Sequence, residues 1–592
     1  MKTSSTNRSP IGLTPLLKLW PWLRPHRKLV YLGSAMIPVV AIIAMIQPLM
    51  LKKAIDDGIL AGNWQITMFW ASFCLLLSFL TYILGGVQTI ATSIAVHRMI
   101  YSMRSSLMRH VLSLPAVWHD NQISGALATR ATSDFDTLSE SLNQGVLSSV
   151  IDILVLAGCI AGMFLLSTKL AVTALIILPI MTWLVIWFSK KLNTSMLASR
   201  RNLATLNGFT QEAISSLSAV KLLNAERGVS GRYQKLNQDY KNSQLENVFY
   251  DALMFASIDG ISSITLGIAL FMAISWAGHE NVFSAGLMVA FVQYIQQLFE
   301  PLKQLGTKMA MLQGAYTSID RIFGLLDLTD KVGGQLPVTW KSEVDVEFKN
   351  VSFTYKPKTP DVLTNINFRL PAGKSLAVIG RTGSGKSTII KLLTKLYAGY
   401  GGIITIGGQS IENLMPEQVR DHLGIVPQDV VLFEGSIAFN ISLGDNAITR
   451  EQIEKATATV GASEFIRDLP GGIDFVVKEN GSNLSQGQRQ LIVFARALVK
   501  NPSLIILDEA TSHIDPHSEA LVQAATAKIL AERTVIVIAH RLETIKKCDL
   551  ILVLENGRIV EMGEPKQLLE IGGRYQELLA FASSTQPTAE QF

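Results

Sequence analysis

The sequence has few cysteines and few charged residues, and both shortages exclude whole classes of protein. Its three cysteines, Cys74, Cys159 and Cys548, are widely separated and no two of them form a CxxC pair. This spacing excludes a disulfide framework and a cysteine zinc site. Charged residues make up only 17% of the chain and the net charge is +5, so we expect no nucleic-acid partner.

Hydrophobic residues are abundant instead, and their distribution is uneven. The mean hydropathy is +0.31, and nearly all long apolar runs lie between residues 29 and 300. Residues 340–580 have the composition of a soluble α/β domain. Because 592 residues are too many for one hydrophobic core, we expect at least two domains.

Six segments of the first half are candidates for membrane-spanning helices, each of which needs about 20 apolar residues. They lie near residues 29–51, 66–90, 142–167, 170–188, 252–277 and 282–302. Only residues 167–169 separate the third from the fourth, which predicts a tight helical hairpin. Two long connections have few Pro or Gly, so we expect the spanning helices to continue through residues 98–141 and 189–251. Each connection is predicted to end in a short crossing helix, near residues 118–125 and 205–212.

Basic residues indicate the side of the membrane that each connection faces. Lys and Arg are numerous before the first span and in both long connections, whereas the opposite side has only Lys52, Lys53 and Lys169. Because basic residues are enriched in cytoplasmic segments, we expect both termini and the soluble domain inside the cell. No presequence of the organelle type precedes the first span, which favours a bacterial inner membrane.

Two carboxylates, Asp152 and Asp259, fall inside predicted spans. A charge in hydrocarbon is costly, so such residues usually line a polar cavity or a substrate pathway. The alternative is a structural carboxylate, placed near the end of a span or bonded to a neighbouring helix. Both interpretations stay open for each residue.

A phosphate-binding loop is predicted between an apolar strand and a helix. Its residues are Gly380, Arg381, Thr382, Gly383, Ser384, Gly385, Lys386, Ser387 and Thr388. The glycines let backbone N–H groups surround phosphate oxygens at a helix N-terminus, where the helix dipole favours an anion. Lys386 would reach the β and γ phosphates, and the Ser387 hydroxyl would bind Mg²⁺. The sequence therefore predicts ATP and Mg²⁺ as ligands.

A second apolar strand, at residues 504–507, runs into Asp508 and Glu509. The C-terminal end of a strand is where open α/β sheets bind ligands. Asp508 suits Mg²⁺ or its water shell, and Glu509 suits polarising the attacking water. An isolated Asp-Glu pair is usually a solvated turn, but the preceding aliphatic residues and the phosphate loop favour an ATPase centre.

With these motifs in place, the chain resembles an ABC exporter of the fused half-transporter type over nearly its whole length. Further motifs carry the resemblance in the family's order: Tyr355 in VSFTY, Gln428 in VPQDVVLF, LSQGQ at 484–488, SHID at 512–515 and His540 in VIVIAHRL. The resemblance implies that Tyr355 stacks on adenine, Gln428 contacts Mg²⁺ and His540 lies near the γ-phosphate. It also implies that the signature residues Ser485, Gly487 and Gln488 serve the nucleotide bound by a partner's phosphate loop.

The resemblance implies a fold of six transmembrane helices in an all-α domain, followed by an α/β P-loop NTPase domain. We expect an N-terminal tail and an interfacial helix at residues 1–28 and the transmembrane domain at 29–325. A linker at 326–342, the nucleotide-binding domain at 343–580 and a polar tail at 581–592 would follow.

The function implied is ATP-driven export of hydrophobic or amphipathic compounds, drugs or lipids, by alternating access. Its catalytic residues would be Glu509, His540 and Lys386. A channel or sensor that uses ATP only to switch is the alternative, and the sequence does not separate the two.

One position of the signature departs from the family. Gln486 replaces the first glycine of the usual LSGGQ, while the phosphate loop, the Asp-Glu pair and the histidine are complete. This combination resembles the competent subunit of heterodimeric multidrug exporters. We therefore expect membrane lipid and a second half-transporter as partners, in a heterodimer rather than a homodimer.

Overall fold

The computed structural model describes residues 14–120, 122, 124–277, 284–328, 333–334, 336–340, 343–356, 359–508, 516–539 and 541–584. The chain forms two compact units. We call Met1–Leu112 with Ile123–Leu328 the helical unit, and Ser113–Gln122 with Thr329–Phe592 the mixed unit.

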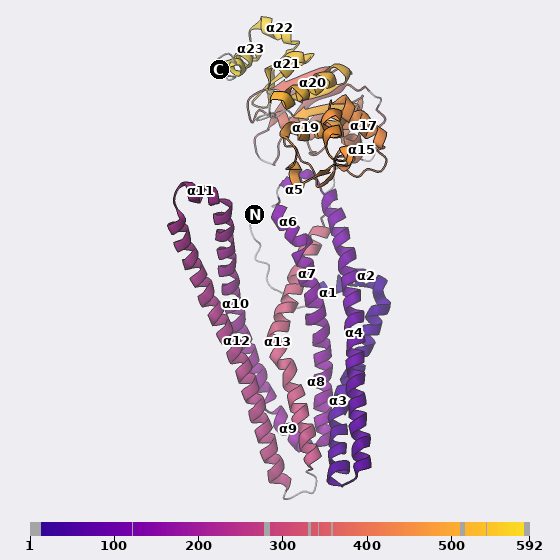
Figure 1. Cartoon of the computed structure of the whole chain (residues 1–592), viewed down its shortest axis with the longest axis vertical. Coiled ribbons are helices and arrows are strands. Elements are labelled where there is room, and N and C mark those ends of the chain that lie inside the picture. The colour runs from indigo at the N-terminus through magenta and orange to yellow at the C-terminus, as the bar shows by residue number, and fades with distance from the viewer. Residues whose placement is uncertain are drawn as a thin grey trace. The chain divides into compact units, whose positions relative to one another are not determined.

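Long helices build the helical unit (Figure 1). Two short helices, α1 (Thr14–Leu17) and α2 (Trp20–Leu23), lead through the turn η1 (Arg24–His26) into α3 (Arg27–Lys53) and the π-helical turn η2 (Ala54–Leu60). After α4 (Trp64–Ser113), the unit continues with α6 (Ser124–Ala131), α7 (Ser133–Glu140), η3 (Ser141–Leu147), α8 (Ser148–Leu166), α9 (Thr168–Leu175), α10 (Leu178–Ser215), α11 (Leu217–Leu222), α12 (Glu226–Ala277) and α13 (Ala285–Leu326). The predicted continuation of the spans into the connections is confirmed for α4, α10 and α12.

Five helical segments of the described residues are long and apolar enough to cross a membrane. They are Pro15–Leu60, Trp64–Ser113, Leu127–Leu166, Thr168–Ser215 and Glu226–Ser275. The sixth predicted span is helical from Ala285 onward, within α13, and residues 282–283 lie outside the described part. Gln293, Gln296 and Gln297 interrupt the hydrophobic run of this helix.

The predicted hairpin of the third and fourth spans is confirmed, because α8 ends at Leu166 and α9 begins at Thr168. The first short helix of a connection, α5 (Ala116–Asp120), lies close to its predicted position. The prediction for the second is wrong: residues 205–212 belong to α10, and the short helix is α11. Nothing in residues 205–212 stops a helix. The chain turns only where Ser216 leaves helical geometry and Asn224 adopts a φ of +50°.

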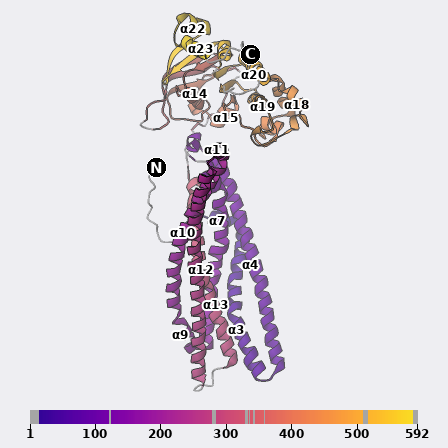
Figure 2. The ribbon, with the colours of Figure 1, turned by 60° about the vertical axis from the view of Figure 1, so that its left-hand side comes forward.

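The hairpin of α10 and α12 carries α11 at its tip, away from α6 and α7 of the same unit (Figure 1). The two helices also lie side by side in the turned view of Figure 2. Polar contacts join them, since the Ser199 hydroxyl donates to Gln244 Oε1 at 2.8 Å and Asn202 Nδ2 donates to Ser243 Oγ at 3.2 Å.

Two sheets organise the mixed unit. A four-stranded antiparallel sheet has the order β2 (Leu363–Leu370), β1 (Val346–Phe353), β4 (Gly401–Ile406), β5 (Gln409–Ser410). A six-stranded sheet has the order β12 (Arg558–Gly563), β11 (Leu550–Glu555), β3 (Ser375–Ile379), β10 (Val535–Ile538), β9 (Leu504–Asp508), β6 (Leu423–Val426), and only β12 runs antiparallel to its neighbour. A short pair, β7 (Gly435–Ser436) and β8 (Val476–Val477), stands apart from both.

Both faces of the six-stranded sheet are buried, as parallel strands require. Along β3, Leu376 and Val378 pack into one core with the antiparallel sheet and α14 (Lys386–Leu393). The alternate residues Ala377 and Ile379 pack into a second core with α19 (Gln486–Leu498) and α20 (Pro516–Glu532). The remaining helices are α15 (Pro416–Asp421), α16 (Ile437–Ser442), α17 (Arg450–Thr459), α18 (Ser463–Asp468), α21 (Leu542–Lys547), α22 (Pro565–Ile571) and α23 (Arg574–Ser584).

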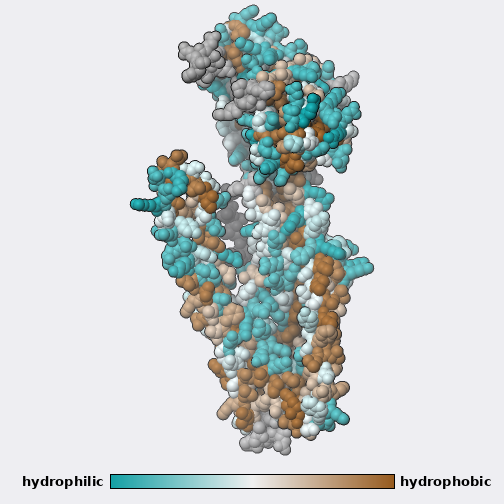
Figure 3. Space-filling model, viewed as in Figure 1, coloured by the Kyte–Doolittle hydropathy of each residue, from teal (hydrophilic) through white to brown (hydrophobic). Residues whose placement is uncertain are grey.

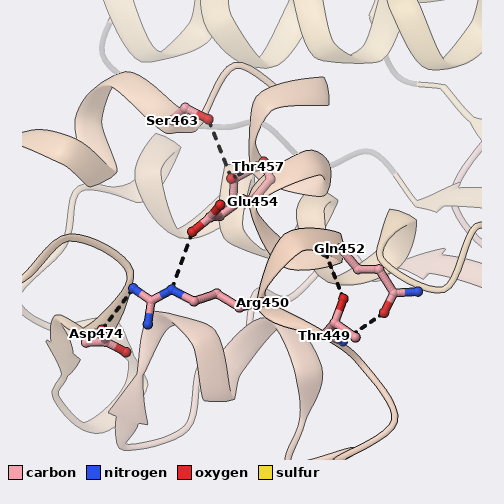
Figure 4. Close-up of polar contacts among 7 residues, drawn as sticks. All are labelled: Thr449, Arg450, Gln452, Glu454, Thr457, Ser463 and Asp474. Carbon is pink, nitrogen blue, oxygen red and sulfur yellow. Dashed lines mark hydrogen bonds and ion pairs between the residues drawn. The ribbon is translucent and has the colours of Figure 1, made fainter.

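The start of α17 shows how local sequence fixes a helix end (Figure 4). Thr449 Oγ1 accepts from the Gln452 N–H, and Gln452 Oε1 accepts from the Thr449 N–H at 2.8 Å. This capping box satisfies two N–H groups that the helix itself leaves free. Arg450 then pairs with Asp474 at 3.1 Å, which fixes the helix against the loop before β8.

Candidate functional site

Four neighbouring parallel strands end together at one edge of the six-stranded sheet. In the register, Ile538 at the end of β10 pairs with Val378 of β3 on one side and with Asp508 of β9 on the other. On the far side of β9, Val426 of β6 pairs with Leu507. The phosphate loop follows β3 and Gln428 follows β6, so the sheet brings three separate motifs to one edge.

A cavity of about 370 Å³ opens at this edge, within the size range of small-molecule sites. Its lining contains Tyr355, Thr382, Gly383, Gly385, Lys386, Ser387, Thr388, Gln428 and Asp508, all of them candidates from the sequence. Val362 and Ile538 also line it, and the sequence carried no signal for these two beyond their strands. Gly380, Arg381 and Ser384 belong to the same loop but do not line the cavity.

Glycine is required at two points of the phosphate loop. Gly380 has a φ of +155°, and a Cβ there would lie 2.2 Å from the Leu554 carbonyl oxygen. Gly385 caps α14 with a φ of +106°, and a Cβ there would lie 2.7 Å from Leu363 Cδ2. The first turn of α14 therefore begins beside the cavity, where its free N–H groups favour an anion.

Lys386 is buried beneath this loop. Its ammonium donates to the carbonyl oxygens of Gly380 at 2.7 Å and Arg381 at 3.0 Å. Burial lowers the pKa of the Lys386 ammonium, and the nearby negative charge of Asp508 opposes that effect. The buried Ser384 hydroxyl has no hydrogen-bond partner among the described residues. A buried cation and free donors beside a helix N-terminus fit a phosphate group.

Oxygen donors for a magnesium ion border the same cavity. Ser387 offers a hydroxyl, Gln428 an amide oxygen and Asp508 a carboxylate. Within the described part of the chain, no group of three or more His, Cys, Asp and Glu residues could hold a metal ion. Mg²⁺ is commonly held by one or two carboxylates together with substrate phosphates and water, and this donor set fits that pattern.

The predicted adenine platform, Tyr355, is half-buried at the wall of the cavity. Its hydroxyl bonds Thr388 Oγ1 at 3.0 Å, which ties the ring to the phosphate-loop helix. The Lys391 ammonium lies 5.5 Å from the ring centroid, and Tyr397 packs edge-on at 5.0 Å. No motif in the sequence marks Lys391, and its only signal is its position one turn after Ser387 on α14.

The short helix α5 packs beside these aromatic residues within the mixed unit. Asp120 accepts a hydrogen bond from the Tyr397 hydroxyl and lies 3.8 Å from the Lys391 ammonium. Ala116 and Val117 join the core of the antiparallel sheet. A segment of the first long connection thus contacts the surroundings of Tyr355.

Several predicted site residues are not brought to the cavity. Glu509, His540 and residues 512–515 lie outside the described residues. Ser485, Gly487 and Gln488 do not line the cavity but form the N-terminus of α19. There the Gln488 N–H donates to Ser485 Oγ at 3.2 Å, and Gln488 Oε1 accepts from the Ser485 N–H at 3.0 Å.

A buried network that no sequence motif indicates links the segment after Gln428 to α19. Asn440 is 0% exposed and bonds the backbone N–H and carbonyl of Phe433, both at 2.8 Å. Arg496 of α19 donates to the carbonyl oxygens of Asn440 at 2.7 Å and Val431 at 3.0 Å. Burial lowers the pKa of the Arg496 guanidinium. No short motif marks such a network, because Arg496 lies 56 residues from Asn440 in the sequence.

The two carboxylates inside the spans both pair with lysines of α13. Asp152 of α8 forms an ion pair with Lys308, which is 7% exposed. Asp259 of α12 lies 2.8 Å from Lys303. These pairs support the structural interpretation of both carboxylates. The lysines follow the predicted sixth span in the sequence, so no local pattern links them to Asp152 or Asp259.

Polar residues form a stripe along one face of α13. Gln296, Glu300, Gln304 and Thr307 are spaced by three or four residues and their side chains are exposed. Figure 3 shows hydrophilic residues in the middle of the helical unit, between hydrophobic residues on either side. Exposed polar side chains on a spanning helix are costly against lipid, so this face is suited to water or a partner helix.

Comparisons with known proteins agree with this arrangement. Family models match the ABC transporter transmembrane region at residues 32–302 and the ABC transporter domain at residues 363–512. The ABC transporter ATP-binding protein YfiC of Bacillus subtilis, itself uncharacterized, is 33% identical over 95% of this chain and 93% of its own length. The ATP-dependent lipid A-core flippase of Haemophilus influenzae is 32% identical over 96% of this chain and 97% of its own.

Two further matches narrow the class. The probable multidrug resistance ABC transporter ATP-binding/permease protein YheH of Bacillus subtilis is 34% identical over 81% of this chain and 72% of its own length. The solved structure of a bacterial Atm1-family ABC exporter with ATP bound superposes with a TM-score of 0.78 at 26% identity, covering 95% of this chain and 99% of that one. The chain therefore belongs to the ABC transporter family, as an exporter whose ATPase domain drives transport through a membrane domain on the same polypeptide.

Proposed function

We propose that this exporter moves hydrophobic or amphipathic compounds, drugs or lipids, out of the cytoplasm across a bacterial inner membrane. One observation carries the proposal: a phosphate loop, Gln428 and Asp508 share one cavity on a chain that also holds the membrane-spanning helices. The multidrug and lipid names of its relatives support the substrate class. The polar stripe of α13 is suited to line the pathway.

We further propose a role for each residue of the nucleotide site. Lys386 and the N–H groups of α14 neutralise the phosphates, Tyr355 supports the adenine, and Ser387, Gln428 and Asp508 hold Mg²⁺. When bound, that ion would add positive charge against the phosphate oxygens. Glu509 and His540 act on the attacking water and the γ-phosphate. The transmembrane domain spans residues 29–325 and the nucleotide-binding domain residues 343–580, with both termini in the cytoplasm.

In this proposal, a second half-transporter completes the functional exporter. Ser485, Gly487 and Gln488 do not line the cavity of their own chain, so they are available to cover the nucleotide of a partner. At the tip of the α10–α12 hairpin, Leu222 and Leu223 are 83% and 76% exposed. Such apolar side chains in water favour docking on another subunit. Gln486 in the signature supports a heterodimer over a homodimer.

Transport in proteoliposomes tests the proposal and separates it from the channel or sensor. With this chain reconstituted together with its partner half-transporter, and with the ATPase domains on the outside of the liposome, ATP should drive uptake of a fluorescent amphipathic dye against its gradient. Glu509→Gln should retain ATP binding and lose uptake together with hydrolysis. Hydrolysis that produces no uphill movement of any amphipathic compound would contradict export and favour the switch.

The composition of the assembly is tested with the chain expressed alone. Under the heterodimer proposal, its mass in detergent corresponds to a monomer or an inactive dimer, and its ATPase rate is low. The variant to compare with the unmodified chain is Gln486→Gly, because it restores the LSGGQ signature of the family and changes no other motif. Full ATPase activity of the unmodified chain as a dimer would refute the heterodimer.

A further inference from the structure

The α10–α12 hairpin contains a second cavity, of about 400 Å³, that has no part in the nucleotide site. Its walls are Trp187, Lys190, Lys191, Thr194, Ser195 and Ala198 from α10 and Glu246 and Tyr250 from α12. The outer end of this span is Thr168. At roughly 1.5 Å per residue, the helical path from Thr168 to Lys190 is about 33 Å long. Since the hydrocarbon core is about 30 Å thick, both lysines lie at its cytoplasmic boundary in the proposed orientation.

The cavity offers hydrogen-bond donors and positive charge that the protein itself does not use. Lys190 and Lys191 are exposed, and neither has an ion-pair partner within the described part of the chain. Ser195 is 4% exposed and lines the cavity, yet its hydroxyl has no hydrogen-bond partner among the described residues. By contrast, the hydroxyls of two nearby residues do have partners: that of Thr194 donates to the Lys190 carbonyl at 3.0 Å, and that of Ser199 donates to Gln244. A buried hydroxyl left unpaired costs stability unless a ligand satisfies it.

Residues on the membrane side of the cavity are apolar. Ile180, Trp183 and Ile186 are exposed on α10, and they come before the two lysines in the span. Trp187 and Tyr250 stand at the boundary, where aromatic side chains are enriched. Along α10, the order is therefore apolar surface, aromatic boundary, two cations and a buried hydroxyl. A phospholipid has the same order, from acyl chain to phosphate.

We propose that this cavity binds the phosphate group of an anionic phospholipid from the inner leaflet, with the acyl chains along α10. Two ammonium groups exceed the single carboxylate of Glu246, so the walls carry a net positive charge that favours an anion. The Ser195 hydroxyl donates to a phosphate oxygen. The site depends on the membrane orientation of the proposed function but not on which compound is exported.

The size of the effect follows from the charges. Each Lys near an anionic lipid surface contributes roughly fivefold to affinity. Replacing both lysines by glutamine should therefore weaken binding about 30-fold. Ser195→Ala removes one hydrogen bond to a charged group and should weaken binding roughly tenfold. Because Ser195 has no partner in the described protein, its replacement leaves no other group unsatisfied.

Native mass spectrometry of the detergent-solubilised full chain, titrated with phosphatidylglycerol, measures this binding. The test variant is Lys190→Gln/Lys191→Gln. Its control, Lys235→Gln/Lys241→Gln, makes the same charge change at exposed positions of α12 outside the cavity. We expect the first pair to lose about 30-fold in phosphatidylglycerol affinity and the control to stay within twofold. Phosphatidylcholine should bind all forms weakly and equally.

Four results would overturn the proposal. Equal losses in both lysine pairs would show a diffuse charge effect, and unchanged binding in the first pair would show that lipid binds elsewhere. Displacement of phosphatidylglycerol by an equal concentration of inorganic phosphate would show that the cavity takes free phosphate rather than lipid. If the double variant does not fold, Ser195→Ala decides: unchanged phosphatidylglycerol affinity refutes the site. Transport enters none of these measurements, so failure of the export proposal is a separate outcome.

Discussion

Asn440→Ala is the substitution whose consequence the structure specifies most closely. The side chain is 0% exposed and fastens the segment after Gln428 to α16. Asn440 Oδ1 accepts from the Phe433 N–H at 2.8 Å, while Nδ2 donates to the carbonyls of Phe433 at 2.8 Å and Ser436 at 3.1 Å. Arg496 Nη2 also donates to Oδ1, at 3.4 Å, so alanine removes four bonds, three of them short.

The magnitude follows from the number of bonds lost. At about 1 kcal/mol for each of the three short hydrogen bonds, the segment loses about 3 kcal/mol of local stability. That energy corresponds to about a 150-fold larger population of the open segment, since roughly 1.4 kcal/mol is tenfold. Because Gln428 belongs to the same segment, ATP hydrolysis should fall. The phosphate loop has no contact with Asn440 in the bonds described, so ATP binding should be retained.

Amide hydrogen exchange of the full chain in detergent measures the opening directly. The Phe433 amide should exchange about 150-fold faster in Asn440→Ala, while amides of β3 keep their protection. Asn483→Ala is the control, since Asn483 is exposed and its bonds to Lys478 and Val476 leave Phe433 untouched. If Phe433 exchanges at the same rate in all three proteins, the network does not fasten the segment and the reasoning is refuted.

Three further substitutions have defined outcomes. Lys308→Met leaves Asp152 without its counter-charge and should cost about 3 kcal/mol, seen as a lower unfolding temperature, whereas the double variant Lys308→Met/Asp152→Leu should recover most of it. No loss in the single variant would contradict the pair. Asp56→Asn removes the negative charge of the carboxylate that accepts a hydrogen bond from the Gly286 N–H at 2.8 Å, at the start of α13. The start of this helix should lose about 1 kcal/mol of stability, which should raise the labelling rate of a cysteine introduced at the start of α13. An unchanged labelling rate would contradict the contact. Lys386→Ala should weaken binding of a fluorescent ATP analogue at least about tenfold, because a charge-assisted contact to phosphate is lost; equal affinity would show that the lysine stays on the loop carbonyls.

Residues of the nucleotide site predicted from the sequence line one cavity, and they could be found because their motifs are local. The loop from Gly380 to Thr388 needs glycine at fixed positions for backbone reasons, and those reasons act within a few residues. The strand before Asp508 is a continuous aliphatic run, which is typical of a strand buried on both faces. Parallel strands then bring such motifs to one edge, so local patterns and one topological rule were sufficient.

The sequence did not predict features that depend on distant partners. Lys303 and Lys308 follow an apolar run, and nothing near them indicates that they pair with Asp259 and Asp152 on other helices. The position of α11 was missed for a different reason. The end of α10 depends on the backbone geometry of Ser216 rather than on a proline or glycine, so no residue type marks it. The network of Asn440 likewise has no local pattern.

The structure shows how the unusual residue of the signature, Gln486, is accommodated in the backbone. A glycine replaced by glutamine suggests a strained backbone, but Gln486 is the first residue of α19, in ordinary helical geometry outside the left-handed region. The capping box of Ser485 and Gln488 forms around it. The substitution is therefore compatible with the start of this helix, and in the proposed assembly it would act on the nucleotide that the signature faces. In a homodimer both nucleotides would meet this glutamine, whereas in a heterodimer only one would, so the cost of Gln486 depends on the partner rather than on this chain.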